Sequence, residues 1–181
     1  DHTVFKAEEV KNRLHETAYL NPALTICFED RRGSEPESII YHEPEGIVGF
    51  VKSINRNKDT VHEVIYVKGE SDGITVEAAF QYVNEFHENV MGFCNNIFNA
   101  EGGTHLTGFK TIFTTVINSY ARQLNILKEK DANFTGPDVR NGMTAVVSIK
   151  HPDPRFEGQT KTKLDNQDAA KVVSKVVGER S

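Results

Sequence analysis

The segment from Thr104 to about Asn125 constrains the fold more than any other part of this chain. Its apolar residues recur at spacings of three, one and four, which is the repeat of a helix with one apolar face. These residues are Leu106, Phe109, Ile112, Phe113, Val116, Ile117, Tyr120 and Leu124. A helix of this length needs a broad apolar surface to cover, so we expect it to lie on a sheet. Thr104 follows two glycines and is the expected N-cap.

Short apolar runs separated by Gly, Asp and Pro turns predict the strands of that sheet. We expect strands at 23–29, 38–43, 62–69, 74–83, 88–98 and 143–150, with the first two forming a hairpin. Helices are expected at 7–20, 45–54 and 167–177, a helical turn at 137–142, and a polar loop at 151–166. The pattern predicts one α/β (α+β) domain over residues 1–181.

The charge of the chain is unevenly distributed. The formal net charge is −5, but residues 1–103 carry 9 Lys/Arg and 18 Asp/Glu, whereas residues 104–181 carry 12 and 8. A basic second half could face the phosphates of a nucleotide or of DNA. From charge alone, an ordinary solvated surface is the favoured interpretation.

Several classes of site are disfavoured. Cys27 and Cys94 lie far apart in apolar surroundings, which favours two buried free thiols over a disulfide. None of the seven histidines is four residues from another, so we expect no metal site. No apolar stretch approaches the roughly 20 residues that span a bilayer, so we expect a cytoplasmic protein without membrane contact.

The chain also lacks the short motifs of nucleophilic and phosphate-loop enzymes, and two segments remain as candidate sites. The turn at 101–104 could hold an anion on its backbone N–H groups, or could simply connect a strand to a helix. The loop at 154–163 places several cations and Gln159 on a flexible connection after a strand. Such a loop could reach a phosphate outside its own domain, or could be a solvated connection.

Two long motifs bring in a family resemblance. EGGTHLTGFKTIFTTVINSYAR (101–122) and DVRNGMTAVVSIKHPDPRFEGQTKTKL (138–164) closely resemble the transducer domain of the ATPase subunits of bacterial type IIA topoisomerases. Three earlier segments, TAYLNP (17–22), EGIVGFV (45–51) and ENVMGFCNNI (88–97), are also similar to that family. The family comprises the B proteins of DNA gyrase and of topoisomerase IV, and we favour the gyrase branch.

The resemblance implies a fold and a site. The fold would be that of ribosomal protein S-five domain 2, with a mixed sheet, helices on one face and a left-handed β-α-β crossover. The Gln-Thr-Lys loop would reach the ATP site of a preceding histidine-kinase/chaperone-type domain. Gln159 and Lys161 would then contact the ATP γ-phosphate, with Lys161 in the catalytic role of stabilising charge during hydrolysis.

The resemblance also implies what lies beyond these residues. The ATPase domain and the following Toprim domain are expected to be absent from this chain, which should therefore not turn over ATP by itself. In the whole protein the cofactors would be ATP and Mg²⁺. The partners would be DNA, the gyrase A protein and a second copy that dimerises through the ATPase domain.

Lys110 and Arg122 are candidate contacts to a DNA cavity. Many relatives carry Arg where this chain has Lys110, so the charge is retained but a bidentate phosphate contact is lost. A stand-alone nucleic-acid-binding module of the same fold is the alternative function. Such a module would need no Gln-Thr-Lys loop and would be expected to be basic, whereas this chain is acidic.

Overall fold

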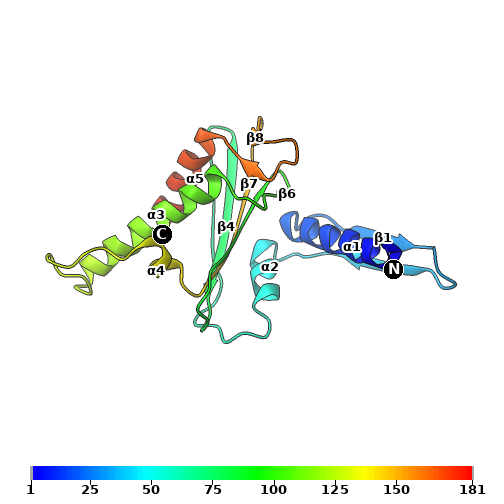
Figure 1. Ribbon diagram of the computed structural model, residues 1–181, viewed down its shortest axis with the longest axis horizontal. Coiled ribbons are helices and arrows are strands. Elements are labelled where there is room, and N and C mark those ends of the chain that lie inside the picture. The colour runs from blue at the N-terminus through cyan, green and yellow to red at the C-terminus, as the bar shows by residue number, and fades with distance from the viewer. Residues whose placement is uncertain (1, 181) are drawn as a thin grey trace.

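The computed structural model describes the backbone of residues 2–180 and the side chains of residues 6–179. The molecule is elongated. A body is built on a five-stranded sheet, and an arm formed by the first part of the chain projects from one side of it (Figure 1).

The sheet of the body is mixed, as expected. It contains β3 (Ile65–Ser71), β4 (Ile74–Tyr82), β5 (Asn89–Cys94), β6 (Ile97–Phe98) and β7 (Met143–Lys150), in the order β3-β4-β7-β5-β6. Neighbouring strands are antiparallel except β5 and β7, which run parallel. The parallel pair requires a crossover connection, and the chain makes it through the long helix.

Two helices cover one face of the sheet. They are α3 (Thr104–Gln123) and α5 (Gln167–Arg180), which pack against each other and against alternate residues of the central strand, Ala145, Val147 and Ile149. The apolar face predicted for α3 is real, because Phe109 and Phe113 are buried in this cluster. The expectation of a long helix lying on a sheet is confirmed.

The opposite face of the sheet is also covered in part. The short helix α2 (Ile47–Ile54) places Phe50 and Val51 against Ala79 of β4 and Val146 of β7. Helices therefore lie on both faces, with the two long ones together on one side. The central strand is consequently buried along almost its whole length.

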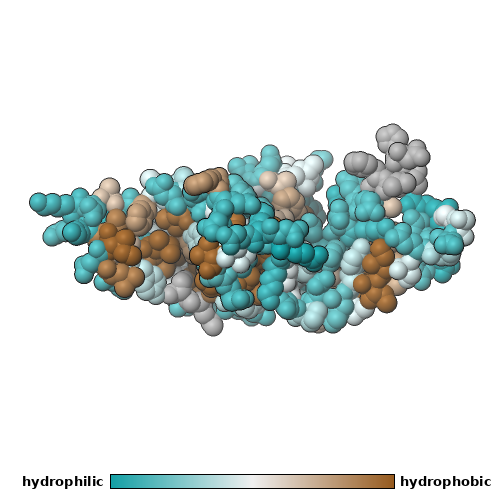
Figure 2. All heavy atoms as spheres, turned by 90° about the horizontal axis from the view of Figure 1, so that it is seen from below, coloured by the Kyte–Doolittle hydropathy of each residue, from teal (hydrophilic) through white to brown (hydrophobic). Residues whose placement is uncertain are grey.

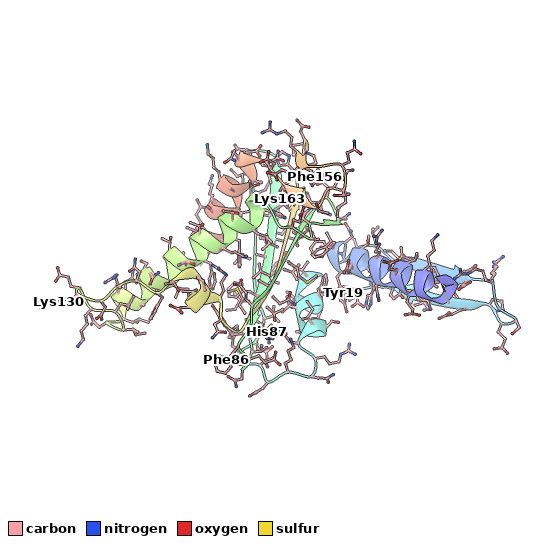
Figure 3. All side chains as sticks on the ribbon, in the orientation of Figure 1. Tyr19, Phe86, His87, Lys130, Phe156 and Lys163 are labelled. Carbon is pink, nitrogen blue, oxygen red and sulfur yellow. The ribbon has the colours of Figure 1, made fainter. Side chains whose placement is uncertain are left out.

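The arm consists of α1 (His2–Leu20) and a hairpin of β1 (Ile26–Asp30) and β2 (Glu37–Tyr41). Tyr19, near the end of α1, stacks on Phe50 with ring centroids 5.0 Å apart and joins the arm to the body (Figure 3).

The surface of the molecule, seen from below, is mainly hydrophilic, with separate apolar patches towards both ends (Figure 2).

The loop expected after the central strand contains a short hairpin. Its strands are β8 (Phe156–Glu157) and β9 (Lys163–Leu164), and it rises from one end of the body beside the start of α5 (Figure 1).

The short helix α4 (Gly136–Arg140) begins with a capping box. Here Thr135 accepts from the backbone N–H of Asp138, and the Asp138 carboxylate accepts from the Thr135 N–H.

Three local expectations were wrong. The strand predicted at 88–98 is broken by a turn at Asn95 and Asn96, which both adopt positive φ, as asparagine does more readily than most residues. The N-cap of α3 is Gly103, with φ 143°, so Thr104 is already the first helical residue. Cys27 is exposed because it lies on the open hairpin of the arm, and only Cys94 is buried.

The contact between the two long helices depends on a missing side chain. A Cβ on Gly108 would lie 2.7 Å from the Ala170 carbonyl oxygen, a backbone atom of α5, and Ser174 donates to the Gly108 carbonyl at 3.4 Å. On an exposed helix, Gly→Ala is normally stabilising by about 1 kcal/mol. At this position the helices would have to move apart.

We expect Gly108→Ala to lower the free energy of unfolding by about 2 kcal/mol, the usual scale of overpacking. Gly178→Ala is the matched control, because its Cβ would meet only the flexible tip of Ile112 at 3.2 Å. The control should change stability by less than about 1 kcal/mol. Urea unfolding measures both variants, and equal stabilities would contradict the close approach.

Candidate functional site

The tip of the β8–β9 hairpin carries the two residues expected to contact a phosphate. Gln159 and Lys161 are both exposed, on a five-residue connection from Gly158 to Thr162. Gly158 has φ 80° with open space around it, and Lys161 itself has φ 59°. The structure thus brings these two side chains together on one exposed turn.

The polar ends of these two side chains are available to a ligand. Within the described residues, no hydrogen bond or ion pair engages the Lys161 ammonium or the Gln159 side-chain amide. The neighbouring cation differs, because Lys163 Nζ lies 3.5 Å from Glu157 Oε2 across the hairpin. The tip therefore presents one unpaired ammonium and one neutral amide donor, a combination that suits a terminal phosphate.

The base of the hairpin is bonded to the turn before α3. The Glu101 N–H donates to the Thr162 carbonyl at 2.8 Å, and the Leu164 N–H donates to the Gly102 carbonyl at 3.1 Å. A side-chain bond reinforces them, since the Thr162 hydroxyl donates to the Glu101 carboxylate at 2.6 Å. Two segments far apart in the sequence are therefore held side by side.

Gly103 allows this close contact. A Cβ at this position would lie 2.4 Å from the Leu164 carbonyl oxygen and 2.6 Å from its nitrogen. The turn at 101–104 also uses its own N–H groups, since Gly102 N–H donates to the Asn99 carbonyl at 2.9 Å. The turn is a packed connection between strand and helix, which was one of the two alternatives left open by the sequence.

A buried pair of polar side chains lies under the loop. Asn99 is 2% exposed, and its Nδ2 donates to the Lys161 carbonyl at 2.9 Å. Its Oδ1 lies 3.0 Å from Nε2 of His105, whose side chain is fully buried. Burial lowers the pKa of the His105 imidazole to about 4, a shift that the Gly103 carbonyl opposes. His105 is therefore neutral at neutral pH.

A second set of contacts fixes the other end of the loop. Nδ1 of His151 accepts from the Asp153 N–H at 2.9 Å, so Nε2 carries the proton and donates to Asp168 Oδ1, also at 2.9 Å. This hydrogen bond lowers the pKa of the Asp168 carboxyl below its ordinary value. Asp168 lies in the first turn of α5, so the contact ties the start of the loop to that helix.

Lys110 and Arg122 lie on α3 rather than on the loop. Lys110 Nζ is 3.9 Å from Glu88 Oε2, which also accepts from Arg140 at 2.9 Å. Arg122 donates to the Lys128 and Asp131 carbonyls and to the Asn133 side chain, and so holds the connection that follows α3. The separation of the two cations along the helix is about 18 Å.

Four residues of the site, Asn99, His105, His151 and Asp168, were not predicted from the sequence. The contacts of Asn99 with Lys161 and of His151 with Asp168 span 62 and 17 residues and arise only from the tertiary fold. No periodic pattern or short motif signals them. Among the described side chains, those of residues 6–179, no group of three or more His, Cys, Asp or Glu could hold a metal ion. In the same part of the chain, no helix is long and apolar enough to cross a membrane.

Comparison with known proteins gives consistent matches. The family model for DNA gyrase B matches residues 46–180. The DNA gyrase B proteins of Streptococcus pneumoniae serotype 4 and of Enterococcus faecalis are each 48% identical to this chain over 98% of its length. The match covers 28% of each relative, so this chain spans little more than a quarter of their length.

Solved structures agree with these relatives. The 43K ATPase domain of Thermus thermophilus gyrase B, in complex with an aminocoumarin, has 33% identity and a TM-score of 0.83 over 96% of this chain and 46% of that one. The topoisomerase IV ATP-binding domain of Francisella tularensis, in complex with a small-molecule inhibitor, has 28% identity and a TM-score of 0.78. That match covers 97% of this chain and 46% of the other.

The lowered pKa of His105 gives the folded chain a pH-dependent stability. Between pH 6.5 and pH 4 the unfolded chain binds a proton that folded His105 refuses, so stability falls as pH falls through this range. The full loss attributable to this group is on the order of 3 kcal/mol. His105→Gln, which keeps an N–H donor but does not titrate, should lose correspondingly less stability between about pH 7 and about pH 4.5 in urea unfolding.

Asn118→Ala provides the control, because Asn118 is also a buried side chain on α3 but does not titrate. It should lower stability and leave the slope of stability against pH as in the parent chain. If His105→Gln and the parent chain show the same slope of stability against pH, then His105 is not the group responsible.

Proposed function

The chain belongs to the DNA gyrase B family, and from this premise we propose that residues 1–181 act as the transducer domain of the gyrase B protein. In this role the chain couples ATP binding and hydrolysis to DNA strand passage and negative supercoiling. The activity belongs to a larger protein, in which this chain works with a histidine-kinase/chaperone-type ATPase domain and a Toprim domain. The remaining partners are DNA, the gyrase A protein and a second copy of the B protein, in the bacterial cytoplasm.

The observation that carries the proposal is the exposed hairpin tip with an unpaired Lys161 ammonium beside the Gln159 amide. In the proposed mechanism the tip reaches the γ-phosphate of ATP held by the neighbouring domain. Lys161 stabilises the negative charge that develops on the γ-phosphoryl oxygens, and Gln159 donates a hydrogen bond to the same group. Mg²⁺ would accompany the nucleotide, with ligands outside this chain.

The anchoring of the hairpin supports a coupling role. Backbone bonds join it to the turn that begins α3, and the contact between His151 and Asp168 joins the same loop to the first turn of α5. A displacement of the tip towards a phosphate would therefore act on the starts of both long helices. Because α3 has 20 residues and is about 30 Å long, a shift of its first turn could be transmitted to residues about 30 Å away.

The B protein of topoisomerase IV is the second candidate, favoured by the similarity to the Francisella tularensis ATP-binding domain. The two functions differ in their products. We expect the whole protein that contains this chain, assembled with its A-type partner, to introduce negative supercoils into relaxed plasmid in the presence of ATP. ATP-dependent decatenation without supercoiling would assign the chain to topoisomerase IV instead.

Replacement of Lys161 tests the catalytic part of the proposal. In the complete ATPase protein, Lys161→Ala should reduce ATP turnover by about 10²-fold or more, the usual scale for the loss of a preorganised electrostatic contact. Nucleotide affinity should fall less, because most ground-state contacts are made by another domain. Steady-state phosphate release and nucleotide titration measure the two quantities.

Lys163→Ala is the matched control, because that ammonium is already paired with Glu157. It should have a much smaller effect on turnover, and Gln159→Ala should fall between the two lysine variants. Thermal melting verifies that each variant is folded. Near-normal turnover of Lys161→Ala would mean that the loop is only a solvated connection.

The proposed DNA contacts have their own test. Binding of duplex DNA by this chain should be weak, non-specific and salt-sensitive, with Lys110 as a phosphate contact. Lys110→Ala should make the negative slope of log K against log salt concentration less steep by about 1. Lys52→Ala, on α2 and paired with Glu45, should leave the slope unchanged. Tight, sequence-specific binding at high salt would favour a stand-alone nucleic-acid-binding module.

Arg122 was a candidate for the same role, but its guanidinium already makes hydrogen bonds to three residues of the connection after α3. Arg122→Ala should therefore reduce thermal stability as well as any DNA binding, and it is a poor probe of DNA contact by itself.

A further inference from the structure

Asn99 is a buried amide that contacts the loop at the residue proposed to be catalytic. It lies between β6 and α3, and its backbone is held on both sides, because its N–H donates to the Gly92 carbonyl and its carbonyl accepts from Gly102. Its Nδ2 donates to the Lys161 carbonyl at 2.9 Å. A rigid scaffold therefore presents this amide to the loop.

The orientation of the Asn99 amide is fixed by its two partners. A backbone carbonyl can only accept, so the nitrogen of the amide must face Lys161 and the oxygen must face His105. His105 Nε2 must then carry the proton and donate. The imidazole packs closely on the backbone at Gly92, where a Cβ would lie 2.6 Å from Nε2. The two hydrogen bonds therefore have the same direction: His105 donates to Asn99, and Asn99 donates to the Lys161 carbonyl.

The backbone of Lys161 needs such support. Its φ of 59° lies in the left-handed region, which residues with a Cβ adopt only when their surroundings hold them there. Among the described residues, Asn99 is the only one outside the loop that forms a hydrogen bond with residues 159–161. The other bonds of the hairpin reach Thr162, the last residue of the connection, and Leu164 in β9.

We propose that Asn99 is a positioning residue for Lys161, and that His105 orients Asn99 for this purpose. The amide holds the Lys161 peptide in its left-handed conformation, which directs the ammonium away from the body and towards a ligand. The effect on the loop follows from the contacts alone. The effect on ATP turnover rests on the proposed function of Lys161.

Asn99→Asp is the sharpest test because it keeps the shape of the side chain. It replaces the donor with an oxygen, so that an oxygen atom faces the Lys161 carbonyl whichever way the carboxylate turns. In the complete ATPase protein, turnover should fall at least tenfold, since misplacement of a reacting group by about 1 Å can cost about 10²-fold. Nucleotide affinity should change by less than about threefold, as expected for a contact made mainly in the transition state.

Asn118→Asp is the matched control. Asn118 is similarly buried, and its Nδ2 donates to the Phe134 carbonyl at 3.0 Å, on the far part of α3 from the loop. The same substitution there should lower the melting temperature without changing turnover per folded protein. Should Asn99→Asp fail to fold, Asn99→Ala removes the donor without adding a charge and serves in its place. For His105, turnover should be largely retained in His105→Gln and lost in His105→Leu.

A double-mutant cycle separates positioning from a general structural effect. If Asn99 acts through Lys161, then Asn99→Asp should have no further effect on turnover in a Lys161→Ala background. An equal loss in both backgrounds would overturn the proposal. The proposal would also be overturned if Lys161→Ala is impaired in turnover but a folded Asn99→Asp variant has normal turnover.

Hydrogen exchange tests the positioning step without nucleotide, on this chain alone. The Leu164 amide, bonded to the Gly102 carbonyl, should exchange about tenfold faster in Asn99→Asp, because the loop opens more readily when its hold on Lys161 is lost. It should be unchanged in Asn118→Asp. If Lys161→Ala keeps normal turnover, the proposed function fails, and exchange alone decides whether Asn99 holds the loop. Unaltered exchange in Asn99→Asp would overturn that part as well.

Discussion

Burial of the central strand on both faces is the constraint on which the rest of the structure depends. Seven of the eight residues of β7 are buried, so apolar side chains must be supplied to both sides of the sheet. The long helices α3 and α5 supply them on one face, and α2 supplies them on the other. The chain passes directly from this buried strand into the loop with Gln159 and Lys161, so the exposed tip follows the strand at the centre of the core.

The main elements could be predicted because their signals are local. The three-and-four spacing along α3 and the apolar run 143–150 each reflect burial that the residues of one element undergo together. The turn at Asn95 and Asn96 was missed because the apolar residues continue on both sides of it, and only the preference of asparagine for positive φ indicates the break. The hairpin at 156–164 was missed because its strands are two residues long and are defined by pairing alone.

The site was predictable only at its tip. Gln159 and Lys161 were identified from a family resemblance, and they lie together because they are close neighbours in the sequence. The contacts that hold them are different in kind. Asn99 and His105 have no distinctive spacing, and their polar atoms find partners only when β6, α3 and the hairpin meet. Arg122 was predicted as a candidate DNA contact from its charge on α3. Its guanidinium instead forms hydrogen bonds to the backbone of the segment that follows the helix, which the sequence does not indicate.

The anchoring of the hairpin on two helix starts also affects the electrostatic potential at its tip. Gly103, the N-cap of α3, is paired with Leu164, and the first turn of α5 is bonded to His151 at the start of the same loop. Two helices therefore begin beneath one hairpin, and each helix start carries roughly half a positive elementary charge. Asp168 offsets part of this charge at α5, and the Glu101 carboxylate, two residues before Gly103 and bonded to Thr162, offsets part of it at α3. The backbone dipoles that remain do not titrate, unlike the side chains around them.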